Sequence, residues 1–213
     1  MKCDVECTIY YVKLFLYLEV EMLVIISGQT NAGKDTLVKY LCKNYNLEGV
    51  CTYTDRPIRH YEKDGREHYF RTREEFDELL KISDVLAYTE IVDEEKKRLD
   101  PSCSGYRYFT DAKDIGDNNI IILDIKGYDY FQASSIPHVS IYISCDEAIR
   151  RERAIKRGDD IKVFEKRCSE ENAQFADALL KGYDLYVSND GAVEDMHKVV
   201  DVFMKSVGGR KIC

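Results

Sequence analysis

Uninterrupted apolar segments, rather than alternating apolar and polar positions, mark the strongest predicted strands of this chain. The clearest are residues 22–27 (MLVIIS), 119–125 (NIIILDI) and 139–144 (VSIYIS). Runs of this kind are typical of strands that are buried on both faces of a parallel sheet. Shorter strands are predicted at 50–54, 85–92 and 183–190.

Helical patterns occupy most of the intervals between these strands. Thr72 and Glu75 form a capping-box pattern ahead of a two-turn helix at 76–82. Further helices are predicted at 34–45, 146–157, from the following RGDDI segment to about residue 181, and 193–207. Strands that alternate with helices specify an α/β fold with a doubly wound parallel sheet.

The domain organisation follows from where this alternation holds. Residues 22–207 form one predicted domain, and the segment from about 50 to 110 departs from the alternation and is predicted to be an inserted subdomain. Met22 stands directly before the first strand. Residues 1–21 are therefore interpreted as an extension of unknown role or an over-long gene start, and residues 208–213 as a tail.

Charge and composition exclude some functions. The net charge of −8 disfavours non-specific binding to nucleic acid or to an anionic membrane. Lys13, Glu19 and Glu21 interrupt the apolar run at 8–26, which also lacks a small-residue cleavage site. The eight cysteines form no C-x-x-C pair, so we expect reduced thiols. These features favour a cytoplasmic protein, a monomer or homodimer, without nucleic-acid or membrane partners.

The first strand runs into a glycine-punctuated loop, in the segment LVIISGQTNAGKDTLVKYL. Gly28 to Lys34 satisfies the pattern G-x-x-x-x-G-K between a strand and a helix. In such a loop, backbone N–H groups and the helix N-terminus bind phosphate oxygens, and the lysine reaches the β- and γ-phosphates. A nucleoside triphosphate is therefore the predicted ligand, with contacts from Gly28, Asn31, Ala32, Gly33, Lys34, Asp35 and Thr36.

Asp35 stands where this kind of loop usually has Ser or Thr. A carboxylate is a hard oxygen donor that can ligate Mg²⁺, directly or through water. The alternative is that Asp35 only stabilises the positive end of the helix. Thr36 supplies a hydroxyl but lies about 100° further around the helix axis. For Asp35, metal contact is the favoured interpretation. Asp124, at the end of an apolar strand, is the second candidate ligand. The alternative for Asp124 is that it only forms a turn at the end of the strand.

The segment TDRPIRHYEKDGREHYF (54–70) narrows the function. It fits the pattern T-T-R-x-P-R-x-x-E-x-x-G-x-x-Y-x-F of the guanylate kinase family without a gap, with matches at Thr54, Arg56, Arg59, Glu62, Gly65 and Phe70. Segments 122–125, 153–167 and 186–190 agree with later parts of the family in order. Over residues 22–207 the chain thus resembles guanylate kinases. The resemblance implies a P-loop kinase fold with an acceptor-binding cap at about 50–110 and a helical lid at about 146–168.

The resemblance also implies an activity: transfer of the γ-phosphoryl group of ATP, with Mg²⁺, to a nucleoside monophosphate, GMP being the commonest acceptor in the family. Two arginines can clamp one phosphate in a bidentate way. Lid cations can meet the charge that spreads over the transferring group. The residues that bind the acceptor would be Thr52, Arg56, Arg59, His68, Tyr108 and Thr110. The catalytic residues would be Lys34, Arg153, Arg157 and Arg167. Asn189 would lie near the adenine of ATP.

Departures from the family pattern gather at the positions that would read the acceptor base. Ala87 and Lys126 stand where the family has two acids that bind guanine. His68 replaces a tyrosine and Phe109 a glycine, while Glu90 or Asp129 could compensate. The alternatives are a kinase for another nucleotide or for a ribose bisphosphate, or a non-catalytic binding module. Because the phosphate-binding residues are retained, an active enzyme is favoured.

Overall fold

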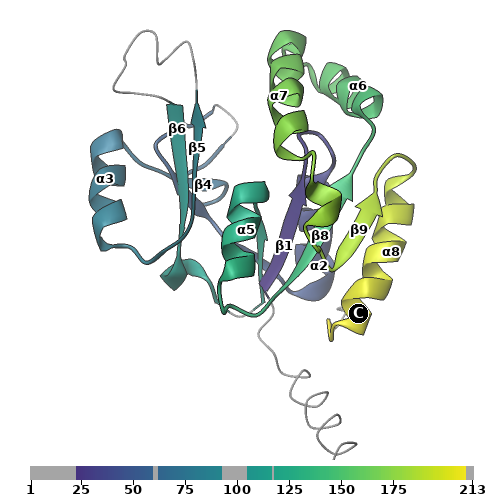
Figure 1. The fold of residues 1–213 in the computed structure, drawn as a ribbon, viewed down its shortest axis with the longest axis horizontal. Helices are drawn as coiled ribbons and strands as arrows, with labels where there is room; N and C mark the ends of the chain where they lie inside the picture. Colours follow the sequence, from purple (N-terminus) through teal and green to yellow (C-terminus); the bar gives the residue numbers. More distant parts are fainter. Residues whose placement is uncertain (1–22, 60–61, 93–104, 117, 210–213) are drawn as a thin grey trace, which may run out of the picture.

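The computed structural model describes residues 23–59, 62–92, 105–116 and 118–209. A five-stranded parallel sheet forms the main body (Figure 1). Its strands lie in the order β2 (Glu48–Gly49), β7 (Asn119–Ile122), β1 (Leu23–Gly28), β8 (His138–Ser144) and β9 (Leu185–Ser188). At the centre, Ile26 of β1 lies beside Ile122 of β7 and Ile141 of β8.

Strand β1 is buried along its whole length because helices cover both faces of the sheet. Val24 and Ile26 belong to an apolar cluster with α2 (Lys34–Tyr45) and α8 (Val193–Ser206). Leu23 and Ile25 belong to a cluster on the other face with α5 (Ile125–Ala133). Neighbouring side chains of a strand point to opposite faces, so an uninterrupted apolar run is what this position requires. The predicted doubly wound parallel sheet is confirmed.

A second, mostly antiparallel sheet accounts for the departure from strand–helix alternation. Its order is β4 (His68–Phe70), β3 (Thr52–Thr54), β6 (Gly105–Asp111) and β5 (Val85–Val92), and helix α3 (Arg73–Ile82) covers one face. Tyr53 and Phe109 pack with Phe76 of α3 on that face. Residues of the opposite face, which include Thr52, His68, Tyr108 and Thr110, are called the acceptor face below.

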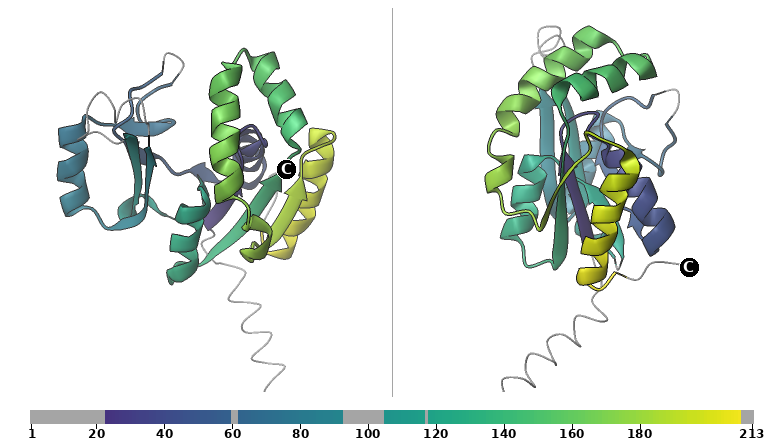
Figure 2. Two further views of the ribbon diagram at one scale, coloured as in Figure 1. Left: turned by 45° about the horizontal axis from the view of Figure 1, so that its top comes forward. Right: turned by 90° about the vertical axis from the view of Figure 1, so that its right-hand side faces the viewer.

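Two helices, α6 (Glu147–Arg157) and α7 (Ile161–Gln174), form a pair that is called the lid. They pack on each other through Ala154, Phe164 and Cys168. Gly158 ends α6 in the left-handed conformation with a φ of 81°, and the Asp160 side chain caps the start of α7. The lid and the second sheet lie on different sides of β1 (Figure 2).

Several predicted boundaries are wrong in ways that hydrogen bonds explain. The strand predicted to reach residue 125 ends at Ile122 because the Asp124 side chain accepts a hydrogen bond from Gly127 N and starts α5. The Thr72–Glu75 capping box forms, so α3 begins at Arg73 rather than 76. Helix α7 ends at Gln174, and a separate 3-10 turn, η3 (Ala178–Leu180), follows. Strands β4 and β6 and the 3-10 turn η2 (Ala112–Asp114) were not predicted.

Some predictions fall on parts of the chain that the structure leaves undescribed. These are the extension at 1–21, residues 93–104 of the predicted inserted subdomain, and the end of the tail at 210–213. Within the described ranges, no helix is both long enough and apolar enough to span a bilayer.

Candidate functional site

The loop between β1 and α2 has the backbone geometry of an anion cradle. Asn31 and Gly33 adopt left-handed conformations, with φ of 58° and 110°. A Cβ atom added to Gly33 would lie 2.2 Å from Nδ2 of Asn189, so this close approach needs glycine. Asn189 directly follows β9 (Leu185–Ser188). Its side-chain amide donates to the carbonyl of Ala32 at 2.7 Å and so fixes the loop to that end of the sheet.

Lys34 folds back over the loop. Its Nζ donates to the carbonyls of Gly28 at 2.7 Å and Gln29 at 2.9 Å. Burial lowers the pKa of Lys34, while the carboxylates of Glu171 and Asp35 act in the opposite direction. The predicted donor-binding lysine therefore lies at the phosphate-binding loop with its ammonium group tied to the backbone.

The candidate metal ligands are oxygen donors near the loop. Asp35 and Thr36 are exposed in the first turn of α2, and no side chain caps that helix. Asp124 accepts hydrogen bonds from Gly127 N (2.8 Å) and Thr89 Oγ1 (3.3 Å), both at Oδ1. The described residues contain no group of three or more His, Cys, Asp or Glu that could hold a metal. Mg²⁺ that arrives on nucleotide phosphates needs only one or two protein carboxylates, so these donors fit that ion.

Lid arginines contact the loop between β1 and α2, residues 28–34, which is called the P-loop below. Arg153 donates to main-chain carbonyls, those of Asn189 (2.7 Å), Asn31 (3.3 Å) and Ala32 (3.4 Å). Arg157 donates to Asn31 Oδ1 at 2.9 Å and pairs with Asp159. Arg167 on α7 is exposed, and its charge contributes to the lowered pKa of Lys34. The structure thus brings Arg153 and Arg157 into contact with the loop, Arg153 in a supporting position, while Arg167 lies on the second helix of the lid.

Sequence reasoning missed two residues of this region, Arg150 and Glu171. Arg150 is only 2% exposed, and its Nη1 donates to the carbonyl of Thr30 at 3.4 Å. Glu171 accepts from the N–H of Thr30 at 2.7 Å. The spacing in the sequence could have identified Arg150. It lies four residues before Ala154, on the buried face of α6, where an apolar residue is expected.

The acceptor face carries polar side chains in register. Thr52 and His68 are paired across β3 and β4, with 2.7 Å between Oγ1 and Nδ1. The rings of His68 and Tyr108 meet edge to face at 5.6 Å, and Thr110 lies buried on β6. Burial lowers the pKa of His68 and the charge of Arg56 adds to this effect. His68 is therefore a neutral hydrogen-bonding group near pH 7.

Arg56 is a buried cation beside this face. Its guanidinium is 8% exposed, donates to Tyr108 Oη at 3.2 Å and binds both oxygens of Glu62 at 2.8 Å. Arg59 reaches the same carboxylate, with its backbone N–H at 2.9 Å and Nη1 at 3.8 Å. Glu62 therefore orients both arginines of the matched motif, which is the bidentate geometry that a lysine could not provide.

This ion pair has a consequence for stability at low pH. Hydrogen bonds from Arg56 lower the pKa of Glu62 from 4.5 to about 2. A depressed carboxyl pKa adds stability above pH 4.5 that is lost as the pH falls toward 2. We expect Glu62→Gln to remove about 3 kcal/mol of this pH-dependent stability. Chemical denaturation between pH 2 and 6 measures it. Glu78→Gln, at a 74% exposed carboxylate, is the control; an equal slope in wild type and Glu62→Gln would contradict the prediction.

The positions that would read a guanine base lack carboxylates in space as well as in sequence. Ala87 is 5% exposed within an apolar cluster, and Lys126 is exposed to solvent. The predicted compensation by Glu90 is wrong, because Glu90 stands opposite Arg107 in the β5–β6 register, on the face that α3 covers. Asp129 instead binds Lys181 at 2.6 Å. Thr89, cross-strand from Tyr108, is on the acceptor face and donates to Asp124.

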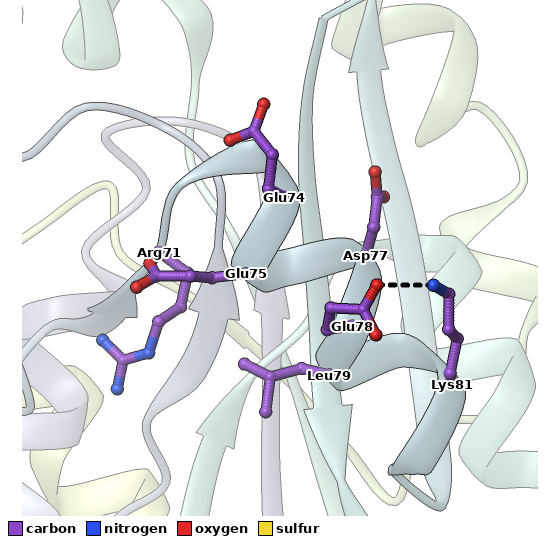
Figure 3. Close-up of a pocket in the computed structure, with 7 residues that line it drawn as sticks. All are labelled: Arg71, Glu74, Glu75, Asp77, Glu78, Leu79 and Lys81. Atoms are coloured by element: carbon purple, nitrogen blue, oxygen red, sulfur yellow. Dashed lines mark hydrogen bonds and ion pairs between the residues drawn. The ribbon is translucent and has the colours of Figure 1, made fainter.

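A separate hollow lies on the outer side of α3 (Figure 3). Its lining is mostly acidic, with one ion pair between Glu78 and Lys81 drawn across it. Carboxylates repel a phosphate group. The phosphate-binding groups are concentrated instead at the P-loop, the lid and the acceptor face.

Three features define the class of P-loop kinases: a buried parallel sheet with a P-loop, an arginine-bearing lid, and an arginine pair in the loop that follows β3 of the second sheet. Comparison with known proteins makes the assignment specific. The family model described as guanylate kinase matches residues 21–206. The chain belongs to the guanylate kinase family, and it is a nucleoside monophosphate kinase.

Relatives and a solved structure agree with this assignment. A guanylate kinase of Streptococcus mutans is 30% identical over 173 residues, which cover 79% of each chain. One from Streptococcus pyogenes is 27% identical over 187 residues, 84% of this chain and 85% of the relative. The crystal structure of guanylate kinase from Anaplasma phagocytophilum has the same fold, with a TM-score of 0.58 at 19% identity, over 92% of this chain and 93% of that one.

Proposed function

We propose that this protein transfers the γ-phosphoryl group of ATP to the phosphate of GMP. The observation that carries the proposal is Arg56, a buried guanidinium that Glu62 and Tyr108 orient on the acceptor face. Such a cation suits a doubly charged phosphate. The family to which the chain belongs, and the names of its relatives, support GMP as the acceptor.

The donor would bind at the P-loop. Backbone N–H groups of residues 28–34 and the start of α2 would hold its phosphates, with Lys34 at the β- and γ-phosphates. Asn189 Oδ1 is a buried acceptor with no hydrogen-bond partner among the described residues, and the amino group of adenine is a donor that would satisfy it. Mg²⁺, held with Asp35 and Asp124, would neutralise phosphate charge when bound.

Catalysis would consist of positioning and electrostatics. The acceptor oxygen is already anionic, so no general base is needed. Arg56 and Arg59, with Tyr108, His68, Thr52 and Thr110 around them, would fix the acceptor phosphate. Arg157 and Arg167 would approach the transferring group from the lid, and Arg153 would stiffen the loop through its carbonyl contacts. Closure of lid and second sheet would exclude water and suppress hydrolysis of ATP.

A second candidate acceptor is a nucleoside monophosphate other than GMP. The observation that favours it is the loss of both base-reading carboxylates, with Ala87 packed in the core and Lys126 in solvent. Unpaired donors on a buried guanine would cost about 1–3 kcal/mol each. For GMP, Thr89 is the group on the acceptor face that would take over part of this role, since its hydroxyl oxygen can accept a hydrogen bond while it donates to Asp124.

The test is ADP formation from ATP and Mg²⁺ with GMP, dGMP, AMP, CMP, UMP, dTMP and ribose 1,5-bisphosphate as acceptors. We expect turnover to be highest with GMP, and Lys34→Ala serves as the blank. A higher kcat/KM with another of these acceptors would mean that this compound, and not GMP, is the preferred acceptor. Bound ATP without turnover on any of them would contradict the kinase assignment and favour a binding module.

A further inference from the structure

Helix α7 of the lid is docked on the phosphate-binding loop through two consecutive residues. Oε2 of Glu171 accepts a hydrogen bond from the backbone N–H of Thr30 at 2.7 Å. Asn172 Oδ1 accepts one from Gln29 Nε2 at 2.7 Å. The Glu171 side chain is only 19% exposed, so its carboxylate is largely withdrawn from water at the P-loop.

The charges around Glu171 are those that attract an anion. Arg150 Nη1 lies 4.0 Å from its carboxylate. Among the charged groups that act on Lys34, Glu171 has the largest influence, and it raises the pKa of that lysine. A P-loop amide next to a lysine and a buried arginine is a place for phosphate oxygens, and here the protein's own carboxylate is bound to it.

We propose that Glu171 gates the donor site: its carboxylate competes with a nucleotide phosphate for the amide of Thr30. This inference rests on the proposed function for the place where donor phosphates bind. One N–H group cannot bond fully to two acceptors. A carboxylate and a phosphate that both lie at the amide of Thr30 would also repel each other. ATP binding and displacement of the Glu171 carboxylate from Thr30 are therefore coupled, and the apparent Kd of ATP equals the intrinsic Kd divided by the fraction of molecules in which Glu171 is displaced.

Arg150 makes displacement of the Glu171 carboxylate feasible. Its guanidinium lies 3.8 Å from Glu147 and donates to the carbonyls of Cys145 at 3.1 Å and Thr30 at 3.4 Å. These partners belong to α6 and the residues before it or to the P-loop, and they stay in place when Glu171 leaves. The buried cation keeps an ionic partner throughout, so displacement does not leave it unpaired in the interior.

The variant Glu171→Gln tests the gate because it keeps the size of the side chain and removes its charge. We expect it to lower the Kd of MgATP about tenfold, which corresponds to about 1.4 kcal/mol. Isothermal titration calorimetry measures this on the full chain. Glu170→Gln is the matched control, since that neighbour is 50% exposed and lies 3.9 Å from Lys166. Glu171→Ala should shift the Kd in the same direction as Glu171→Gln.

A structural readout separates the gate from a general effect on charge. In the nucleotide-free protein, the amide resonance of Thr30 should move in Glu171→Gln and stay in place in Glu170→Gln. An unchanged Kd in Glu171→Gln, with normal ATP binding in the wild type, overturns the gate and leaves the proposed function standing. Weaker binding of MgATP, but not of ATP alone, would make Glu171 a metal ligand and also overturn it. No ATP binding by the wild type would refute both.

Discussion

Replacing Lys34 by alanine is expected to lower kcat about 10³-fold while leaving the fold intact. Lys34 is the one cation among residues 28–34. Its ammonium group contacts the carbonyls of Gly28 and Gln29, so it lies beside the loop that would bind the phosphates. Removing one preorganised group that stabilises developing charge typically costs 10²–10³ in kcat. Because chemistry here is almost entirely electrostatic, we place this loss at the upper end of that range.

Steady-state kinetics with ATP and the preferred acceptor measure this loss, and circular dichroism checks the fold. Lys39→Ala is the matched control: Lys39 is an exposed residue of the same helix, one turn further on. It should keep wild-type kcat. A Lys34→Ala protein with more than about a tenth of wild-type kcat would place the donor phosphates elsewhere, because a direct phosphate contact is worth more than that.

Arg56→Ala is expected to have the second largest effect, a fall of about 10²–10³ in kcat/KM for the acceptor with the KM of ATP unchanged. Each charge-assisted hydrogen bond contributes roughly 1.5–3 kcal/mol, and the fixed positive charge of Arg56 also attracts the phosphate. The same change should lower the free energy of unfolding by about 3 kcal/mol, because it leaves the Glu62 carboxylate, 6% exposed, without its main partner.

The double variant Arg56→Ala/Glu62→Gln separates these two effects. Neutralising Glu62 removes the unpaired buried charge, so the double variant should recover much of the stability. It should not recover kcat/KM, since the acceptor phosphate still lacks its cation. Arg66→Ala, at a 58% exposed arginine, is the control for both measurements. Recovery of activity in the double variant would mean that Arg56 acts through stability alone.

Local sequence patterns determined the main body of this protein. The apolar run at 22–27 and the G-x-x-x-x-G-K loop after it predict a buried central strand followed by a phosphate-binding turn, and both are present in β1 and the loop before α2. The reason is that these features depend on near neighbours in the chain: strand burial needs consecutive apolar residues, and the loop needs glycine at a left-handed position. Arg56, Arg59 and Glu62 likewise lie within seven residues, so their cluster is a local one.

Sequence boundaries failed where a side chain decided between two local structures. The apolar run at 119–125 predicts a strand to residue 125, although Asp124 also has the alternative of a turn former. The hydrogen bond from Gly127 N to Asp124 makes the aspartate a helix cap and ends the strand early. The acceptor subdomain was recognised by its departure from alternation, but β4 and β6 were not, because β4 has only three residues and β6 (GYRYFTD) lacks a regular alternation of apolar and polar residues.

Only the tertiary structure decided which charges meet. Glu90 and Thr89 are neighbours in sequence, yet the pairing of β5 with β6 turns Thr89 toward the acceptor face and Glu90 toward α3. Glu171 reaches Thr30 across 141 positions, and Arg150 reaches it across 120. Contacts of this kind depend on how a lid helix packs over a loop far away in the chain. The phosphate-binding groups are thus readable in the sequence, whereas the carboxylate bound among them follows from packing.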